Sequence, residues 1–359
     1  MEKRITLWMQ EEYHFPKAGK FIPFLMAHLH DDEAVRPAML VIPGGGFILP
    51  SSGEADGVAD KFYHMGYNTF VFVYTNNVTL DNPMVHQALR DASRAVKTIR
   101  ARSEEFHVDP NRIFGIGFSG GGYMAAALAT LYDSPEMSGD VKYPEVSNQL
   151  DAAVLVYALV SGEKYTCPGA FDRLLGEGAS TEDVETYSLN TRVKNNSVPM
   201  YIMHGSADVM CPPNNALLMA EACTKEDVPF ELHLYLGCNH GFTCAALDPR
   251  FTVSSQYVYE QLYYTIEAMS EEEFSGYGEL FANLRQGMNY GEFAKVVTEE
   301  TMMKLWMTGL HVDFAKLQEA MGATAGNASY AMNPNPNTDA WWLGVDRWIK
   351  MIMRESTNE

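Results

Sequence analysis

The sequence predicts an α/β fold: a doubly wound, mostly parallel sheet with a helical insertion before the last helix. Apolar strand-like runs alternate with helical patterns from about residue 20 to residue 240, which is typical of such a sheet. One of these runs passes through a glycine-rich turn directly into a helix near residue 119. Beyond residue 244 the alternation stops and helical patterns follow one another.

The sheet is predicted from seven apolar runs with the length and composition of buried strands. In chain order these are 21–29, 38–42, 69–74, 113–118, 152–159, 200–204 and 231–236. The helical patterns between them cover 55–65, 85–106, 121–132 and 214–224. In the longest helix, apolar or small residues recur at the spacing of one buried stripe, at Val85, Ala88, Leu89, Ala92, Ala95, Val96 and Ile99.

Residues 160–198 form a polar, glycine-containing excursion between two predicted strands. Such a segment can lie over the carboxyl ends of the strands and shape a pocket there. It can equally be a solvated crossover connection. Both interpretations stay open at the level of sequence.

The C-terminal part is predicted to consist of helices, for example 256–269 and 279–286, with Ser270 and Glu273 as a capping box. An Asn-Pro run at 333–337 breaks the chain, and a last helix at 339–353 should dock on the main sheet. Its apolar face consists of Trp341, Trp342, Val345, Trp348, Ile349 and Ile352. The predicted organisation is a core at 1–244, a helical insertion at 245–336 and a final core helix at 337–359.

Composition restricts the classes of partner. The 359 residues are 47% hydrophobic and 20% charged, an ordinary globular composition, and the formal net charge is -20. That charge argues against nucleic acid or an anionic membrane as a partner, since both attract clustered Lys and Arg. The first residues do not resemble a signal peptide, and no apolar run of about 18 residues could span a membrane.

The five cysteines are odd in number and lack CxxC spacing, so we expect free thiols, a cytoplasmic location and no zinc site.

Ser119 is the predicted nucleophile. An apolar strand ends in Gly117-Phe118-Ser119-Gly120-Gly121, and a helix-forming run follows at once. This is the strand–turn–helix context of a nucleophile elbow, in which a sharp turn exposes the serine hydroxyl above a helix N-terminus. The alternative is a glycine-rich turn in which the serine merely caps the helix.

A serine hydroxyl needs an adjacent base, and the base needs an orienting acid. The elbow fold places these later in the chain in the order Asp, then His. Asp208 follows the predicted strand 200–204, and His240 follows the strand 231–236. Alone, Asp208 could be a loop or cap residue and His240 a structural histidine, but their order and their positions at strand ends favour a triad. His204 is a rival base whose place at a strand end fits packing better.

A second glycine run supplies the predicted oxyanion hole. The strand 38–42 ends in Pro43-Gly44-Gly45-Gly46-Phe47, where the main chain can approach a substrate closely. We expect the N–H of Gly45 or Gly46, together with that of Gly120, to face the developing oxyanion. A phosphate-binding loop is excluded because no Lys-Ser/Thr closes the run. A tight turn without chemistry is the alternative. Phe47 and Tyr123 are expected to line the substrate pocket or to pack beneath it.

Together these residues resemble the α/β-hydrolase superfamily, and within it the acetyl-xylan-esterase-like carbohydrate esterases. The similarity runs from residue 37 to residue 242. It rests on Val41-Ile42-Pro43-Gly44-Gly45-Gly46-Phe47, Ser52, Glu54, Gly66-Tyr67-Asn68, Tyr74, Gly115-Ile116-Gly117-Phe118-Ser119-Gly120-Gly121, His204-Gly205 with Asp208 and Pro212, and His240-Gly241-Phe242. The resemblance implies a serine esterase with Ser119 as nucleophile, His240 as base and Asp208 as its orienting acid.

The chain also departs from this family. Phe47 stands where tyrosine is common, Gly120 where alanine is common, and Pro43 replaces the histidine of the His-Gly-Gly-Gly lipase motif. Relatives usually reach their final helix soon after the catalytic histidine, whereas here residues 245–336 intervene. This insertion could be a lid, a surface for homo-oligomer formation or extra packing.

The resulting hypothesis is a serine carboxylesterase that hydrolyses short-chain acyl esters through an acyl-enzyme and requires no cofactor or metal. Acetyl esters of sugars or xylo-oligosaccharides are the small-molecule substrates that the resemblance suggests. The alternatives are a serine peptidase of prolyl-oligopeptidase type and a non-catalytic binding protein on a hydrolase fold.

Overall fold

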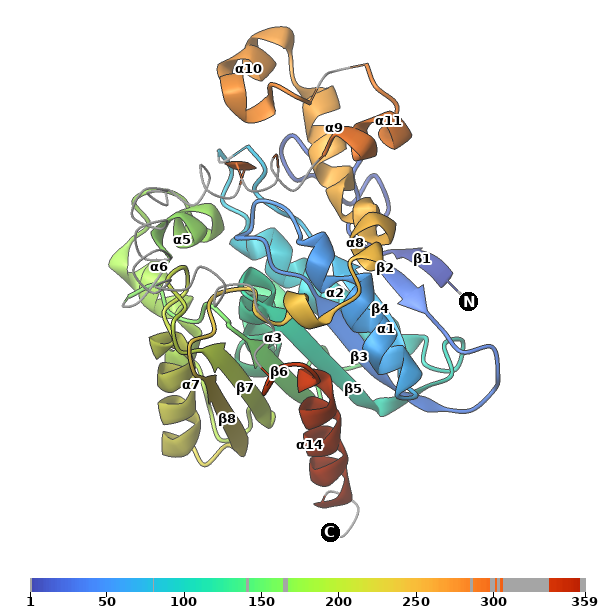
Figure 1. Cartoon of the computed structure of the whole chain (residues 1–359), viewed down its shortest axis with the longest axis vertical. Helices are drawn as coiled ribbons and strands as arrows, with labels where there is room; N and C mark the ends of the chain where they lie inside the picture. Colours follow the sequence, from blue (N-terminus) through green and yellow to red (C-terminus); the bar gives the residue numbers. More distant parts are fainter. Residues whose placement is uncertain are drawn as a thin grey trace.

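The protein is described by a computed structural model that covers residues 2–79, 81–139, 142–163, 167–284, 287–297, 301, 304–305 and 336–355. An eight-stranded sheet in the order β1-β2-β4-β3-β5-β6-β7-β8 forms its centre (Figure 1). β1 and β2 pair antiparallel, as do β2 and β4, and all other neighbours are parallel. The strands are β1 (Glu2–Thr6), β2 (Phe24–His28), β3 (Arg36–Ile42), β4 (Asn68–Val73), β5 (Val108–Phe118), β6 (Ala152–Val156), β7 (Met200–Gly205) and β8 (Phe230–Tyr235).

The predicted doubly wound α/β fold is confirmed, and each of the seven predicted strands corresponds to one of β2–β8. The edge strand β1 escaped prediction because only Ile5 of its five residues is buried, so it contains no apolar run. β5 begins at Val108, earlier than predicted, through a polar stretch with a register shift against β3. β6 ends at Val156 because Tyr157, with φ 36°, turns the chain out of the sheet.

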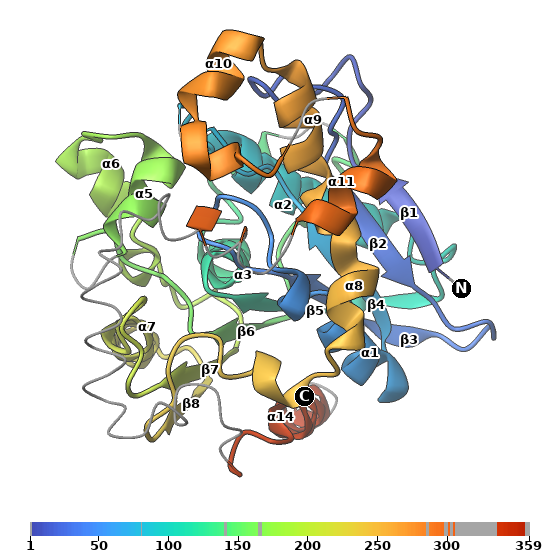
Figure 2. The same ribbon diagram turned by 45° about the horizontal axis from the view of Figure 1, so that its top comes forward.

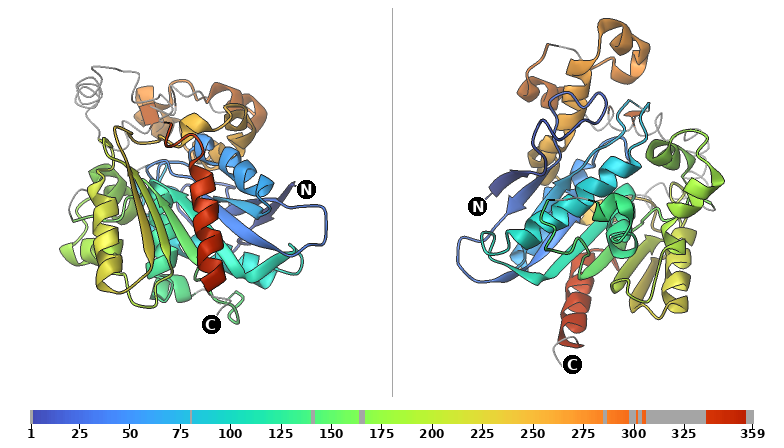
Figure 3. Two further views of the ribbon diagram at one scale, coloured as in Figure 1. Left: turned by 60° about the horizontal axis from the view of Figure 1, so that its bottom comes forward. Right: turned by 180° about the vertical axis from the view of Figure 1, so that it is seen from behind.

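Helices cover both faces of the sheet (Figure 3). α1 (Asp56–His64) and α14 (Trp341–Glu355) lie on one face, and α2 (Val85–Ala101), α3 (Gly120–Thr130) and α7 (Asn214–Lys225) lie on the other. The predicted helix 85–106 ends already at residue 101. The chain must reverse there into β5, and His107 takes a left-handed conformation with φ 48° to do so.

The last helix docks on the sheet as predicted. Trp341, Val345, Trp348 and Ile349 of α14 are buried, while Trp342 and Ile352 are half-buried. The Trp341 ring lies 6.0 Å from the ring of Phe118 in β5, and the Tyr67 hydroxyl donates to Asp346 (3.0 Å).

Two helical excursions lie on either side of α3 at one edge of the sheet (Figures 1 and 2). The first lies between β6 and β7 and contains α5 (Pro168–Leu175), α6 (Thr181–Thr186) and the 3₁₀ turn η2 (Leu189–Thr191). The one-turn helix α4 (Pro135–Ser138) precedes β6. The second contains η3 (Cys244–Ala246), α8 (Arg250–Ser254), η4 (Ser255–Tyr259), α9 (Glu260–Ala268), α10 (Glu271–Gly276), η5 (Gly278–Phe281) and α11 (Tyr290–Val296).

The C-terminal helices match their prediction only in part. The capping box is present: Ser270 Oγ accepts from the amide of Glu273, whose carboxylate accepts from the amide of Ser270. The predicted helix 256–269 is a 3₁₀ turn that continues into α9. The predicted helix 279–286 is wrong, because residues 278–281 form only a 3₁₀ turn; residues 285–286 are outside the described part.

Most of the Asn-Pro run and all of 306–321 also lie outside the described residues. The division at 244 and 336 stays a prediction.

All five cysteines are free, as expected. Within the described ranges there is no helix long and apolar enough to cross a membrane, and no group of side chains that could hold a metal ion.

Candidate active site

The turn between β5 and α3 holds Ser119 in a strained backbone conformation, with φ 51° and ψ -117°. Left-handed φ values are uncommon for residues other than glycine and cost roughly 1–3 kcal/mol, a cost the surroundings must offset. A Cβ on Gly117 would lie 2.1 Å from the carbonyl oxygen of Gly121, and a Cβ on Gly121 would lie 2.1 Å from that of Ile42. Only glycine fits at these two positions, so the packing of the turn enforces the conformation of Ser119.

The structure brings Ser119, His240 and Asp208 into one hydrogen-bonded chain. They come from the ends of three strands: Ser119 follows β5, Asp208 follows β7 and His240 follows β8. His240 Nδ1 lies 2.7 Å from Asp208 Oδ2, and His240 Nε2 lies 2.9 Å from Ser119 Oγ. An ionised carboxylate can only accept, so Nδ1 carries the proton of the neutral imidazole and Nε2 accepts from the serine hydroxyl. This arrangement can remove a proton from Ser119 as it attacks a carbonyl.

The side chain of Asp208 is fully buried, and both of its carboxylate oxygens have hydrogen-bond partners. Its Oδ1 accepts from the amides of Met210 (3.0 Å) and Cys211 (2.8 Å), and its Oδ2 contacts both His240 and His204. Burial by itself would raise the pKa of Asp208, but the two imidazoles outweigh it and hold the pKa well below its ordinary value. Asp208 is therefore an anion across the physiological pH range.

His204, the rival base, lies behind this carboxylate. Its side chain is buried, and its Nε2–H donates to the carbonyl of Cys211 (2.8 Å) while lying 3.2 Å from Asp208 Oδ2. The nitrogen that Ser119 contacts belongs to His240. His204 thus supports the acid, a role that its position in the sequence did not reveal.

The environment of His240 favours its protonated form. Burial alone would lower the pKa of this imidazole, but Asp208 and then Glu54 outweigh that effect and raise the pKa above its ordinary value. The ring of Tyr157 packs on the imidazole with ring centroids 4.7 Å apart.

A small pocket lies beside Ser119, with a volume of about 20 Å³. Gly46 and Gly120 line it together with Ser119 and His240. The amide of Gly120 has no partner inside α3 because it belongs to the first residue of that helix. Gly45 does not line the pocket, so of the two alternatives after β3 the structure favours Gly46. The remaining wall consists of Leu159, Cys167, Ala170, Met210 and Cys211.

Phe47 and Tyr123 pack beneath the turn and do not line this pocket. Both side chains are fully buried, with their rings edge to face at 5.7 Å. A Cβ on Gly120 would lie 3.0 Å from the Phe47 ring. The ring can pack directly against the turn because residue 120 has no side chain. Tyr123 is tied further away by its hydroxyl, which donates to the carbonyl of Tyr187 (3.0 Å). Of the two expectations for Phe47 and Tyr123, the structure supports packing beneath the pocket and not lining it.

The first helical excursion reaches the site. Cys167 precedes α5 and Ala170 lies within it, and both line the pocket next to Ser119. Of the two interpretations of 160–198, the structure thus supports a segment that shapes a pocket.

Sequence reasoning missed the interactions of Glu54 and Tyr157. Glu54 in η1 (Ser52–Glu54) is buried and accepts from the amide of Gly44 (2.8 Å) and from the hydroxyl of Tyr157 (2.7 Å). Burial raises the pKa of Glu54, although these two hydrogen bonds and His240 counteract it. Nothing in the spacing of Glu54 or Tyr157 indicates that they meet.

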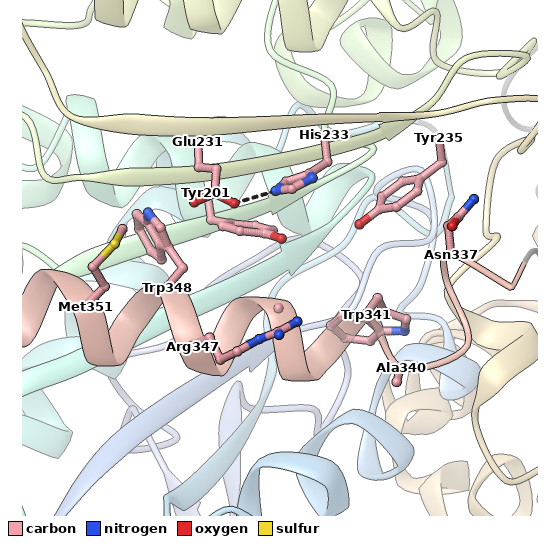
Figure 4. Close-up of a pocket in the computed structure, with 11 residues that line it drawn as sticks. Tyr201, Glu231, His233, Tyr235, Asn337, Ala340, Trp341, Arg347, Trp348 and Met351 are labelled. Carbon is pink, nitrogen blue, oxygen red and sulfur yellow. Dashed lines mark hydrogen bonds and ion pairs between the residues drawn. The ribbon is translucent and has the colours of Figure 1, made fainter.

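A second pocket of about 380 Å³ lies between β8 and α14 (Figure 4). Tyr201, His233 and Tyr235 form its sheet side, and Trp341, Arg347 and Trp348 of α14 lie opposite. It shares no lining residue with the pocket at Ser119, and none of the predicted site residues lines it.

Comparison with known proteins agrees with this fold. The family model BD-FAE matches residues 26–223, more than half of the chain. Endo-1,4-beta-xylanase B of Butyrivibrio fibrisolvens is 34% identical over 242 residues, which are 67% of this chain and 38% of that protein. Isoprenylcysteine alpha-carbonyl methylesterase ICME of Arabidopsis thaliana is 22% identical over 58% of this chain and 51% of its own length. The chain thus spans about half or less of the length of these curated relatives.

Solved structures include two informative neighbours. The acetyl ester-xyloside bifunctional hydrolase of Caldicellulosiruptor lactoaceticus is 30% identical, with a TM-score of 0.63 over 73% of this chain and 97% of that one. The carboxylesterase Cest-2923 of Lactobacillus plantarum shares the fold at 22% identity, with a TM-score of 0.57 over 73% and 96% of the two chains. By its sequence match, its sheet order and its Ser119 turn, the chain belongs to the BD-FAE family of α/β-hydrolases.

Proposed function

We propose that the protein is a serine carboxylesterase that hydrolyses short-chain acyl esters through a covalent acyl-enzyme. The observation that carries this proposal is the continuous hydrogen-bonded chain from Ser119 through His240 to Asp208. It begins on a strained turn at a helix N-terminus, where two glycines line the same small pocket.

Ser119 Oγ attacks the ester carbonyl while His240 Nε2 takes its proton, and Asp208 stabilises the imidazolium that forms. The carbonyl oxygen becomes negative and accepts hydrogen bonds from the amides of Gly46 and Gly120. His240 then gives its proton to the leaving alcohol, which departs and leaves Ser119 acylated. Water activated by His240 releases the acid and regenerates the serine.

The size and lining of the pocket support a short acyl group. A volume of about 20 Å³ leaves room for little more than a water-sized group, which needs roughly 10–15 Å³. Leu159, Ala170 and Met210 make its wall largely apolar, which suits an acetyl methyl group better than a longer chain. For the alcohol we propose a sugar or a xylo-oligosaccharide, because a relative of 30% identity is named an acetyl ester-xyloside hydrolase.

The test is a comparison of acyl substrates and leaving groups. We expect the wild-type protein to react with a fluorophosphonate probe at Ser119 and to hydrolyse nitrophenyl acetate faster than nitrophenyl esters of longer acids. Acetylated xylosides should release acetate. Preference for Ala-Pro-nitroanilide would favour a peptidase. Failure of the folded protein to react with the probe would favour a non-catalytic binding protein.

A further inference from the structure

We propose that Glu54 is a positioning residue of this site, a second buried carboxylate that anchors the glycine turn after β3 and stabilises positive charge on His240 across Tyr157. The inference rests on the proposed function, because it assigns a role in the same reaction. It goes beyond the triad and the oxyanion donors, neither of which includes Glu54.

Glu54 is buried without a cationic side chain beside it among the described residues. Its residue exposure is 5%, and within the described ranges no lysine or arginine forms an ion pair with it. Burying an unpaired carboxylate is costly, and its hydrogen bonds offset only part of that cost. A charge that forms nearby during the reaction, on His240, would complete the compensation.

A chain of contacts leads from Glu54 through Tyr157 to the base. Tyr157 donates its hydroxyl proton to Glu54 Oε1 (2.7 Å) and accepts from Thr243 Oγ1 (2.7 Å). The ring of the same tyrosine packs on the imidazole of His240 at 4.7 Å. Tyr157 holds a left-handed backbone, φ 36°, which an L-residue adopts only when its surroundings enforce it. The tyrosine thus spaces Glu54 from His240 in a defined geometry.

Glu54 also contacts the glycine turn that follows β3. Its Oε2 accepts from the amide of Gly44 (2.8 Å). The chain at Gly44 passes so close to the nucleophile that a Cβ there would lie 2.9 Å from the Cβ of Ser119. Holding this amide orients the peptides that follow, up to Gly46 in the pocket wall. One carboxylate therefore links the proposed oxyanion turn to the base.

The direction of the electrostatic effect follows from the groups that face His240. Ser119 follows β5, Tyr157 follows β6, Asp208 follows β7, and Glu54 lies in η1. Burial raises the pKa of Tyr157 and of the nearby thiol of Cys244, so both stay protonated and neutral, and the charges come from the two carboxylates. Both carboxylates favour the imidazolium. Removing the charge of Glu54 therefore lowers the pKa of His240.

The experiment compares Glu54→Gln, Glu54→Asp and a control, Asp91→Asn. Asp91 is also a fully buried carboxylate, but it accepts from Trp8, Thr75 and Gln87 in a separate cluster on α2. The control therefore reports the general cost of neutralising a buried acid. The pH dependence of kcat/KM is measured with nitrophenyl acetate, together with thermal stability. The pKa of His240 is followed independently by NMR of ¹³C-labelled histidine, assigned with His240→Asn.

We expect Glu54→Gln to lower the pKa of His240 by about one unit, as loss of a nearby charge commonly does. The midpoint at which kcat/KM falls at low pH should move down by the same amount. The plateau rate should fall about tenfold, because one pKa unit corresponds to a factor of ten in stabilising the imidazolium. Glu54→Asp should return this midpoint toward its wild-type pH, and Asp91→Asn should leave it at the wild-type pH.

An unchanged His240 pKa in Glu54→Gln, with only stability or overall rate reduced, would overturn the inference and leave Glu54 a structural residue. Wild-type protein that neither reacts with fluorophosphonate nor cleaves the ester would instead contradict the proposed function. The NMR titration does not depend on turnover, so it reports the effect of Glu54 on the pKa of His240 in either case.

Discussion

The carboxyl edge of the central strands and the helical segment after His240 are built in different ways. At the edge, the turns after β3, β5, β7 and β8 are packed so tightly that certain positions admit no Cβ, and buried polar groups are held by short hydrogen bonds. The helical segment α8–α11 instead packs on the rest of the molecule through side chains. Val258, Leu262 and Ile266 are buried in the core. The hydroxyls of Tyr257 and Tyr259 hydrogen-bond to Asp56 and Ser52. Gln261 bonds the backbone of Asn76, and Glu260 forms an ion pair with Arg4.

The two regions differ in how rigidly their backbone is held. A reaction centre needs atoms fixed to fractions of an ångström, which requires a rigid and locally strained framework. Among the described residues, none from α8–α11 lines the pocket at Ser119. We therefore expect the largest losses of rate and of stability at the edge, and smaller losses, mainly of stability, in the helical segment.

The largest effect is expected for Ser119→Ala. Removing the nucleophile leaves only the oxyanion donors and binding, so kcat for nitrophenyl acetate should fall by about 10⁴-fold or more. Circular dichroism should show an unchanged fold. Activity within tenfold of wild type would contradict the assignment of Ser119.

Asp208→Asn should reduce kcat by about 10⁴-fold, because a neutral amide does not stabilise the His240 imidazolium and holds the imidazole in the wrong tautomer. His204→Gln is the matched comparison, since His204 contacts the same carboxylate but not Ser119. We expect it to cost activity about tenfold, through Asp208 alone. Equal losses in the two variants, measured under the same conditions, would mean that His204 takes part in proton transfer.

Gly45→Ala should destabilise the protein by about 3 kcal/mol or more, because its φ is 123° and the new Cβ would lie 1.9 Å from the carbonyl oxygen of Leu49. At Gly276, the last residue of α10, an added Cβ would have no other atom within 4 Å. Gly276→Ala should therefore change stability by about 1 kcal/mol or less. Urea unfolding measures both. Comparable losses would remove the contrast between the two regions.

The wild-type pH profile should show the raised pKa of His240 that Asp208 and Glu54 cause. The base is active when neutral, and its pKa is raised, so kcat/KM should fall as pH drops through a value above the ordinary histidine pKa of about 6.5. Steady-state rates between pH 5 and pH 9 with nitrophenyl acetate would show the limb. A limb below 6.5 would indicate that burial dominates over Asp208 and Glu54.

The smallest effect on catalysis is expected in the helical segment. Gln261 is buried, and its amide bonds both the N–H and the carbonyl of Asn76 (2.8 Å each), so Gln261→Leu leaves two backbone groups unpaired. We expect a loss of about 1–3 kcal/mol in stability, with kcat within about threefold of wild type. Glu272→Gln, at an exposed position of α10, should be neutral in both measurements. A loss of kcat as large as that of Asp208→Asn would show that this segment is part of the reaction centre.

Sequence reasoning succeeded where the signal was local. The apolar runs predicted β2–β8, and the turn at Ser119 stands where it does because strand, glycines and helix are contiguous in the chain. The capping box at Ser270 and the stripe of α14 were predictable for the same reason. Prediction failed at β1, whose single buried residue makes no pattern. It also failed at the start of the predicted helix 279–286, because residues 278–281 form only a 3₁₀ turn.

The candidate site divides along the same line. The identities of Ser119, Asp208 and His240, and the glycines of both turns, are written in the chain as motifs at strand ends. The fold alone decided three features. It determined which glycine faces the pocket and that Phe47 packs beneath the turn. It also brought Glu54 into contact with Gly44 and Tyr157. The reason is physical: a motif specifies local backbone geometry, whereas a contact between residues 54 and 157 depends on how strands distant in sequence pack side by side.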